Sequence, residues 1–402
     1  MKFKNILSAA TALMLTSVLA FSGCTDQKNE NSAEESSAPQ SSEKKQESSK
    51  NTEKSEASKT ESKTESKAEN SAAQSSVEEQ EYSLPAYNKI TPAVWEVTDS
   101  NAHVIYMMGS IHAADADALE MPDYFETAYA KCDSLAVECD ITEAQLDIFG
   151  LGELLYTDGT TIKDHVPEED YKKAVETLST AGSYNANYDY MKPIMWSSLG
   201  EAVAIQRAGL NTNYGIDTLL IKRAKEEKKT VLEVESVDSQ YTLLANLPEK
   251  VQLLMFHQLT TDDYIDDMEK ELRETYEGWK NGTLDDSLVE SDADITEESL
   301  SDEDLKLLEQ YNDAMLNNRN KGMVEKAQEY MKEGKTVMFV VGSAHFYGEK
   351  GILQLMKDNG CTIRQLTTED AEKPPAKAAF AAESTEEESS VPETDPGTAR
   401  AA

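Results

Sequence analysis

Two stretches of this chain share one pattern, in which an apolar run ends in Gly-x-x-His. The first stretch covers residues 104–112 and ends at His112, and the second covers residues 336–345 and ends at His345. Apolar runs of this length that stop at a glycine predict buried β-strands. Strands that are apolar throughout need cover on both faces of their sheet, so the pattern predicts an α/β fold.

Other short segments complete this prediction. A polar turn at residues 99–101 lies between two β-branched and aromatic runs and predicts a hairpin, and Pro122 suits the first turn of a helix. The expected strands are 94–98, 104–108, 134–139, 230–234, 336–341 and 361–366, with helices at 122–131 and 349–357. Hydrophobic periodicity predicts that residues 143–318 are largely helical. The expected fold class is therefore α/β, with a mixed sheet built from two strand-Gly-x-x-His-helix halves and a helical middle region.

Residues 1–24 have the features of an export signal. Lys2 and Lys4 precede an apolar run, and the run is followed by two small residues and Cys24. A Cys in this position resembles the bacterial lipoprotein motif, in which the Cys becomes the lipidated N-terminus. We therefore expect lipidation at Cys24 and an extracytoplasmic protein anchored to the bacterial cell membrane. The alternative is a signal that is cleaved nearby, with Cys24 as a bystander.

The segments that flank the middle of the chain have compositions typical of disorder. Residues 25–82 consist mainly of Ser, Glu, Lys, Ala, Asn, Gln and Thr, and residues 367–402 are acidic with several prolines. Such segments have too little apolar surface to offset the entropy lost on ordering. We expect a disordered tether over 25–82, a folded domain over 83–366 and a disordered acidic tail over 367–402.

The charge of the chain is strongly negative. The sequence has 38 Lys+Arg against 76 Asp+Glu, for a formal net charge of −38, and about −28 of it falls on residues 83–366. This excludes a basic nucleic-acid-binding surface, and it favours cations and basic peptides as ligands, subject to screening by salt. The very acidic stretch 262–304 is better interpreted as solvated helix faces than as a cation site, because it lacks the spacing of a calcium-binding loop.

The candidate site residues stand where strands end. In an α/β fold the carboxyl ends of the strands form the ligand-binding edge, so His112 and His345 could reach one cleft, together with Glu138 after the strand 134–139. Two imidazoles and a carboxylate form a common set of ligands for a catalytic divalent metal. The alternative is structural: the histidines cap helices or satisfy loops, and a buried Glu138 or Glu233 pairs with Arg319.

Other enzyme motifs are absent from the sequence. It contains no Gly-x-Ser-x-Gly elbow, His-Glu-x-x-His helix, phosphate-binding loop or dinucleotide fingerprint. Ser110 and Ser343 lie within the Gly-x-x-His segments, but no sequence feature provides a base for either. Cys132, Cys139 and Cys361 are interpreted as core or structural residues, with a pair among them possible after export.

The motifs, taken together, resemble the TraB/PrgY/GumN family, which includes the Tiki metalloproteases of animals. The matching blocks occur in the family's order, at 94–97, 106–112, 121–122, Glu138, 192–193, 215–217, 232–233, Gln240, 318–320, 341–345, Gly348, Gly351 and Gly360. The departures are mild: Ser110, Ser343 and Phe346 replace residues more usual in the family, and the acidic insertion at 285–304 has no counterpart that we identify.

The resemblance implies a metal-dependent, hydrolase-like site. The Tiki members resemble metalloproteases that clip an extracellular signalling protein with manganese or cobalt, and zinc is a further possibility. Carried over by motif, His112, His345 and Glu138 are the expected metal ligands. Glu138 is alternatively a general base, and Arg319 polarises the substrate carbonyl or orients Glu138.

The leading functional hypothesis is a surface-tethered, divalent-metal-dependent hydrolase, namely a peptidase that acts on an extracytoplasmic peptide or protein. The alternative, drawn from the pheromone-shutdown members of the family, is a non-catalytic protein that binds and sequesters a peptide signal. A scaffold with a vestigial site is a third, blander hypothesis.

Overall fold

The computed structural model describes residues 89–142, 152–289 and 301–372, all of which belong to one compact unit of the chain. The expected lipoprotein signal with Cys24, the tether over 25–82 and residues 373–402 of the acidic tail lie outside the described residues. Within the described part, no helix is long and apolar enough to cross a membrane.

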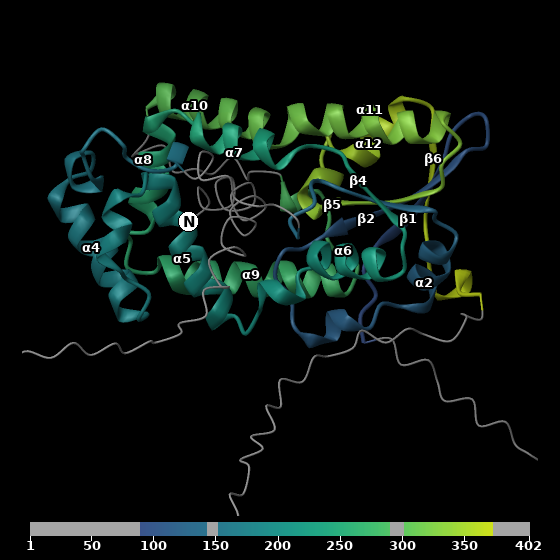
Figure 1. The fold of residues 1–402 in the computed structure, drawn as a ribbon, viewed down its shortest axis with the longest axis horizontal. Helices are drawn as coiled ribbons and strands as arrows, with labels where there is room; N and C mark the ends of the chain where they lie inside the picture. Colours follow the sequence, from purple (N-terminus) through teal and green to yellow (C-terminus); the bar gives the residue numbers. More distant parts are fainter. Residues whose placement is uncertain (1–88, 143–151, 290–300, 373–402) are drawn as a thin grey trace, which may run out of the picture. The chain divides into compact units, whose positions relative to one another are not determined.

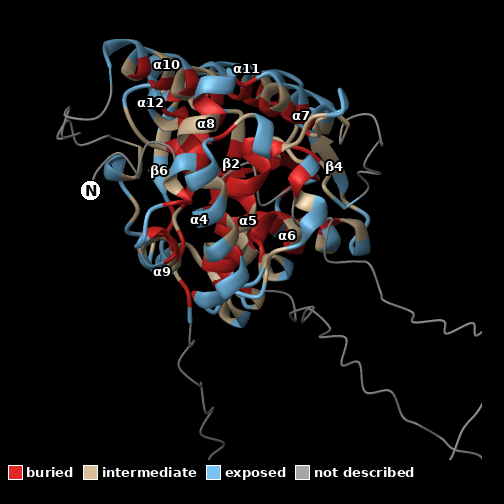
Figure 2. Ribbon diagram, turned by 90° about the vertical axis from the view of Figure 1, so that its left-hand side faces the viewer, coloured by how far each residue is buried: buried red, intermediate tan, exposed pale blue. Residues whose placement is uncertain are grey.

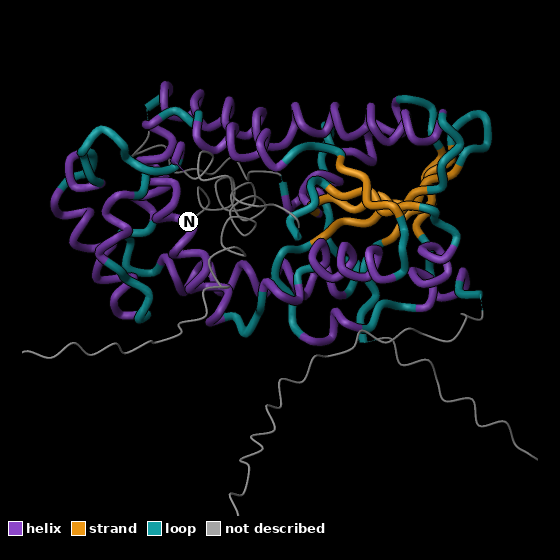
Figure 3. The backbone as a smooth tube through the Cα atoms, in the orientation of Figure 1, coloured by secondary structure: helices purple, strands orange, loops and turns teal. Residues whose placement is uncertain are grey.

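The described part of the chain contains a six-stranded mixed sheet, which lies in the right-hand half of Figures 1 and 3. Its strands, in spatial order, are β4 (Thr230–Glu233), β3 (Ser134–Val137), β5 (Val337–Gly342), β2 (Val104–Ser110), β1 (Val94–Thr98) and β6 (Thr362–Gln365). β4, β3, β5 and β2 run parallel to one another, whereas β1 is antiparallel to both β2 and β6. The predicted α/β class with a mixed sheet is confirmed.

The hairpin between β1 and β2 follows from local side-chain chemistry. Oδ1 of Asp99 accepts hydrogen bonds from the backbone N–H groups of Asn101 and His103, at 2.8 and 2.9 Å. Short Asp side chains favour turns because they replace backbone hydrogen bonds in this way. Ala102 adopts a positive φ of 64° at the end of the turn.

Helices cover both faces of the sheet, as the apolar strands require. One face packs against α2 (Asp123–Ala130), α6 (Ile216–Glu226) and the C-terminal part of α9 (Tyr264–Lys280). The other face packs against α11 (Asn318–Lys332) and α12 (Ile352–Asp358). The buried residues in Figure 2 concentrate between these layers. β5 is buried along its whole length, as its uninterrupted apolar sequence predicts.

The middle of the chain forms a helical region beside the sheet, as its periodicity predicts (Figure 3). It consists of α4 (Glu168–Thr180), α5 (Pro193–Arg207), α7 (Val237–Ala245), α8 (Glu249–Gln258), the N-terminal part of α9, and α10 (Asp302–Asn312). Two apolar clusters hold these helices together, one around Met255 and Tyr311 and the other around Trp196 and Phe256.

A π-helical turn, η7 (Asp313–Asn317), joins α10 directly to α11. The turn is closed by a hydrogen bond from the N–H of Asn318 to the carbonyl of Asp313. Single π-turns inside α-helices insert one extra residue and occur frequently at functional sites. This one ends at Asn317, two residues before Arg319.

The described structure extends past Leu366, where the sequence predicts that the folded domain ends. A capping box, in which Thr367 and Asp370 exchange hydrogen bonds, forms the short helix η9 (Thr368–Asp370). The N–H of Glu372 then donates to the Thr127 hydroxyl of α2, at 3.1 Å. Residues 367–372, which the sequence assigns to the tail, are therefore hydrogen-bonded to one another and to α2.

Candidate functional site

Three adjacent parallel strands bring the predicted site residues to one edge of the sheet. β3, β5 and β2 are neighbours in the sheet, and Glu138, His345 and His112 follow their carboxyl ends. Ser110 of β2 is in register with Gly342 of β5, so the two Gly-x-x-His segments leave the sheet side by side. The edge at the carboxyl ends of parallel strands is the usual ligand-binding edge of such sheets.

The two Gly-x-x-His segments are bound to each other. The Ser343 hydroxyl donates to the carbonyl oxygen of Ser110 at 2.8 Å. A Cβ atom on Gly109 would lie 2.9 Å from Cα of Ser343, so only glycine permits this approach. Ser343 therefore has a structural role, in agreement with the absence of a nucleophile motif.

His112 lies against the start of α6. The N–H of Ile216 donates to the carbonyl of Ile111 at 2.9 Å, and a Cβ on Gly215 would lie 2.4 Å from the carbonyl oxygen of His112. Gly215 thus allows the first turn of α6 to reach the histidine segment. The same turn provides Asp217, whose Oδ2 lies 2.8 Å from Nδ1 of His112.

In the described structure, the His112 ring has the Asp217 carboxylate next to Nδ1 and no hydrogen-bond partner at Nε2. Its Nε2 is buried without a hydrogen-bond partner in the described structure, and the Asp217 contact is a close charge contact rather than a well-aligned hydrogen bond. Burial alone would lower the pKa of His112, but the Asp217 carboxylate outweighs burial and raises it to about 9. Such buried, unpartnered nitrogens are rare in native proteins unless an ion, water or ligand satisfies them.

Glu138 is buried among three donors. The N–H of Gly342 donates to Oε1 at 2.7 Å, while Nε2 of Gln240 and Nη2 of Arg319 donate to Oε2 at 3.0 and 2.5 Å. Burial would raise the pKa of this carboxyl, but the adjacent Arg319 charge outweighs burial and holds the pKa well below its usual range. Glu138 is therefore an ionised carboxylate despite its burial.

Arg319, at the start of α11, connects several parts of the site. Its guanidinium binds Glu235 through Nε and Nη2, at 2.6 to 3.0 Å, in addition to Glu138, and Nη1 donates to the carbonyl of Met315 in the π-turn at 3.1 Å. Of the two carboxylates that the structural interpretation offered as partners of Arg319, the structure shows Glu138, and Glu235 is an additional partner that was not predicted. Glu233 instead accepts a hydrogen bond from the N–H of Asp140, at 2.9 Å.

His345 is a fully buried, neutral ring with an assigned tautomer. Nη1 of Arg319 lies 3.1 Å from its Nε2, and Oδ1 of Asn320 lies 2.5 Å from its Nδ1. Because a guanidinium only donates, Nε2 accepts and Nδ1 carries the proton. Burial and the Arg319 charge lower the pKa of His345 to about 3.

A further acidic residue, Glu201 of α5, was not predicted from the sequence. Its side chain is buried, and Oε1 has no hydrogen-bond partner in the described structure. Burial raises its pKa to about 8, and the charge of His112 acts in the opposite direction. No motif identifies Glu201, because it occurs in an ordinary helical segment. Asp217, Gln240 and Asn320, in contrast, stand inside the family's motif blocks, which could have indicated them.

The donor atoms of the predicted ligands fit a divalent metal in chemistry. Each histidine has Nδ1 next to an oxygen atom, of Asp217 or Asn320, which is the arrangement that orients metal-binding imidazoles. Nε2 of His345 also lies 3.8 Å from Oε1 of Glu138. Residues 89–142, 152–289 and 301–372 nevertheless contain no three His, Cys, Asp or Glu side chains already grouped as a metal site. Here Arg319 contacts two of the three predicted ligands.

Cys132, Cys139 and Cys361 are free thiols in the described structure. Sγ of Cys139 contacts Oε1 of Gln240 at 3.4 Å, which orients the amide that donates to Glu138. Cys132 is buried in the core, as predicted.

Comparisons with known proteins show which proteins and which family the chain is similar to. The chain is 24% identical over 266 residues to the uncharacterized protein YbaP of Escherichia coli (strain K12), covering 66% of this chain and 92% of YbaP. The YbaP protein of Shigella flexneri matches with the same identity and coverage. No solved structure matches the chain. The model of the TraB/PrgY/gumN family matches residues 93–365, and the chain belongs to this family.

Proposed function

We propose that this protein is a divalent-metal-dependent hydrolase that cleaves an extracytoplasmic peptide or protein. The observation that supports the proposal is the buried Nε2 of His112, which lacks a partner while Asp217 occupies the other side of the ring. His112, His345 and Glu138 would hold the cation. When bound, manganese or cobalt, or alternatively zinc, would polarise a carbonyl and lower the pKa of a water molecule.

The protein's own groups have separate roles in this proposal. Asp217 and Asn320 orient the two imidazoles, and the N–H of Gly342 orients the Glu138 carboxylate. Arg319 has a positive charge at the same edge of the sheet, where it can stabilise negative charge that develops on a carbonyl oxygen. Glu138, ionised at neutral pH, is suited either to cation binding or to accepting a proton.

The test begins with metal content. The purified protein is dialysed against manganese and analysed by inductively coupled plasma mass spectrometry, and binding is measured by calorimetry. His112→Ala and His345→Ala should lose the cation and the peptide cleavage, with circular dichroism unchanged. His257→Ala, which removes an exposed ring on α8 that is paired with Asp170, is the matched control. A His112/His345 double variant that binds manganese with wild-type stoichiometry refutes the metal assignment.

The second candidate function is capture of a peptide signal without cleavage. It is favoured by the contacts of Arg319, which occupy Glu138 and His345 in this structure. Mass spectra of peptides incubated with the protein separate the two functions. Fragments that depend on added metal support hydrolysis, whereas intact peptides that co-purify with the protein support capture.

The cellular location is part of the proposal. A lipid on Cys24 would hold the folded domain outside the cytoplasm at the membrane surface, at the end of the tether 25–82. Detergent phase partition of cells that express wild type or Cys24→Ser tests this. The wild type should enter the detergent phase and the variant the aqueous phase; equal partition would refute lipid anchoring.

A further inference from the structure

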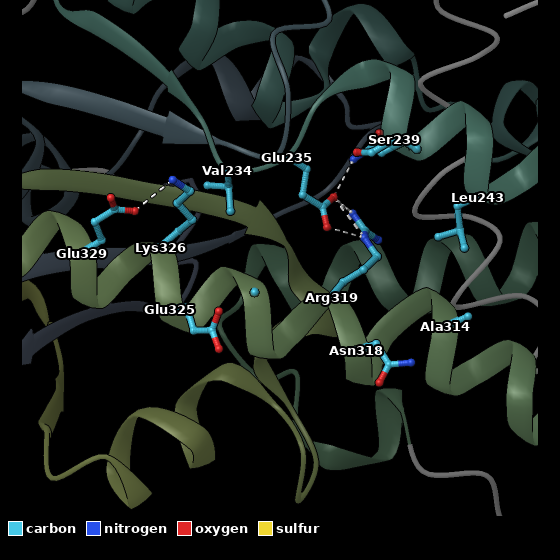
Figure 4. A pocket seen from close by; sticks show the side chains of 12 residues that line it. Val234, Glu235, Ser239, Leu243, Ala314, Asn318, Arg319, Glu325, Lys326 and Glu329 are labelled. Atoms are coloured by element: carbon cyan, nitrogen blue, oxygen red, sulfur yellow. Dashed lines mark hydrogen bonds and ion pairs between the residues drawn. The ribbon is translucent and has the colours of Figure 1, made fainter.

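A pocket with a volume of about 550 Å³ lies between α7 and α11, beside the candidate site (Figure 4). Glu235 and Gln240 line one side of it, and Arg319, Gly322 and Glu325 line the other. A volume of this size is within the range of pockets that bind small ligands or single side chains.

The pocket and the candidate site share residues. Arg319 and Gln240 line the pocket, and both donate to the Glu138 carboxylate, at 2.5 and 3.0 Å. Figure 4 shows the ion pair of Arg319 with Glu235 between the two helices. A group bound in the pocket is therefore separated from Glu138 by one layer of side chains.

The charges that line the pocket leave an excess of negative charge. Arg319 is compensated by Glu235 and Glu138, and Lys326 pairs with Glu329 at 2.9 Å. Glu325 is exposed, and in the described part of the chain it has no ion pair or hydrogen bond.

The rest of the lining includes the apolar side chains of Val234, Leu243 and Ala314. Figure 4 shows Val234 on the same side of the Arg319–Glu235 pair as Glu325, with Leu243 and Ala314 on the other side. An apolar side chain close to a carboxylate that has no cationic partner fits an alkyl chain that ends in a cation, because the chain packs while the charged end stays near water.

We propose that this pocket is a subsite for a lysine or arginine side chain of the bound peptide. The stem of the side chain packs against Val234, and its cationic end lies near Glu325. The inference rests on the proposed function in one respect, which is that the bound peptide is a substrate. Selective binding can be measured whether or not the peptide is cleaved.

Gly322 provides the means to close the pocket without disturbing the fold. It lies within α11, and a Cβ at this position would meet no atom within 4 Å. A larger side chain there would extend into open space in the pocket. Removing a glycine from a helix interior also favours the helix, so Gly322→Leu is expected to fold.

The experiment uses three mixtures of acetylated octapeptides, randomised except at one central position fixed as Lys, norleucine or Glu. The immobilised protein is incubated with each mixture at low salt, and the retained peptides are quantified by mass spectrometry. We expect about tenfold more retention of the Lys mixture than of the norleucine mixture, because a charged contact contributes that order of selectivity. The preference should weaken at 0.5 M salt.

Two variants and a control assign the preference to the pocket. Gly322→Leu should abolish the Lys preference and Glu325→Gln should reduce it several-fold, with thermal unfolding curves that show a folded protein. Gln328→Leu introduces the same side chain on α11 outside the pocket lining and should leave the preference intact.

The possible outcomes separate the inference from the proposed function. Equal retention of the Lys and norleucine mixtures, or a Gly322→Leu variant that behaves like Gln328→Leu, overturns the subsite even if the protein cleaves peptides. Lys selectivity that depends on Gly322 and Glu325 supports the subsite even if no fragment ever forms, in which case the proposed hydrolysis fails alone.

Discussion

Nη1 of Arg319 donates to Nε2 of His345 across 3.1 Å and thereby places the ring proton on Nδ1, where Asn320 accepts it. A fixed positive charge beside a buried imidazole keeps that imidazole neutral. In the neutral ring, Nε2 of His345, which lies 3.8 Å from Oε1 of Glu138, therefore has a lone pair. This is the protonation state that cation binding needs.

The tautomer of His345 gives the first prediction. In ¹⁵N-labelled protein without added metal, the shifts of His345 should show protonated Nδ1 and unprotonated Nε2 from pH 5 to 8. Asn320→Ala removes the acceptor of a buried N–H group and should cost about 1–3 kcal/mol of unfolding free energy. A wild-type His345 that gains a second proton in this pH range would contradict the assignment.

Removing the Arg319 charge gives the second prediction. Arg319→Met leaves Glu138 and Glu235 without their cation, and an uncompensated buried charge typically costs about 3–5 kcal/mol. Glu235 is more exposed than Glu138, so Glu235→Gln should cost less. Urea unfolding of the two variants and of the double variant provides the coupling energy. Additive effects would show that the Arg319–Glu235 pair contributes no coupling.

Replacing two glycines by alanine gives a third prediction, in which the unfolding free energy falls at one position and rises at the other. Gly215→Ala places a Cβ 2.4 Å from the carbonyl oxygen of His112 and should destabilise the protein by about 1–3 kcal/mol. Gly322→Ala meets open space inside α11 and should stabilise it by about 0.5–1 kcal/mol. Chemical denaturation measures both. Equal effects of the two substitutions would mean that the close approach of α6 to the His112 segment is absent in solution.

The buried carboxyl of Glu201 gives a fourth prediction, on pH dependence. Burial raises the pKa from 4.5 to about 8, so between these values the folded protein holds a proton that the unfolded chain has released. The free energy of unfolding is therefore not reduced by Glu201 below pH 4.5, and it falls as the pH rises from 4.5 toward 8. Glu201→Gln should therefore gain stability over wild type across this range, by at most about 1.4 kcal/mol per pH unit.

The control for this measurement is Glu169→Gln, at an exposed position in the first turn of α4. Its difference from wild type is the baseline with which Glu201→Gln is compared. A pH dependence of Glu201→Gln no larger than this baseline would show that Glu201 is ionised in the folded protein and therefore has a partner or access to water.

The strands could be predicted from the sequence because they depend on local patterns. Residues 337–342 are apolar without interruption, and this pattern predicts a buried strand. Residues 94–98 and 104–110 flank a turn whose Asp99 hydrogen bonds are local as well. Glu138 and the two histidines could be placed at one edge because parallel strands end on the same side.

The rest of the site depends on contacts between distant segments, which no local pattern encodes. Glu235 lies beyond the end of β4, where the backbone turns into α7, and it reaches Arg319 from there. Glu201 reaches the site only through the packing of α5 against α9. The position of Arg319 depends on the π-turn before it, and no residue type in 313–317 distinguishes that turn from ordinary helix.

The π-turn has a consequence for how the sequence can change by insertion and deletion. An α-helix turns by about 100° per residue, so the extra residue in Asp313–Asn317 sets the rotational phase between α10 and α11. Deleting a single residue there would restore ordinary helix and keep the chain's composition nearly intact. It would also rotate Arg319 away from Glu138, or Tyr311 away from the helical core. The length of this five-residue turn is therefore as constrained as the identity of any residue in the site.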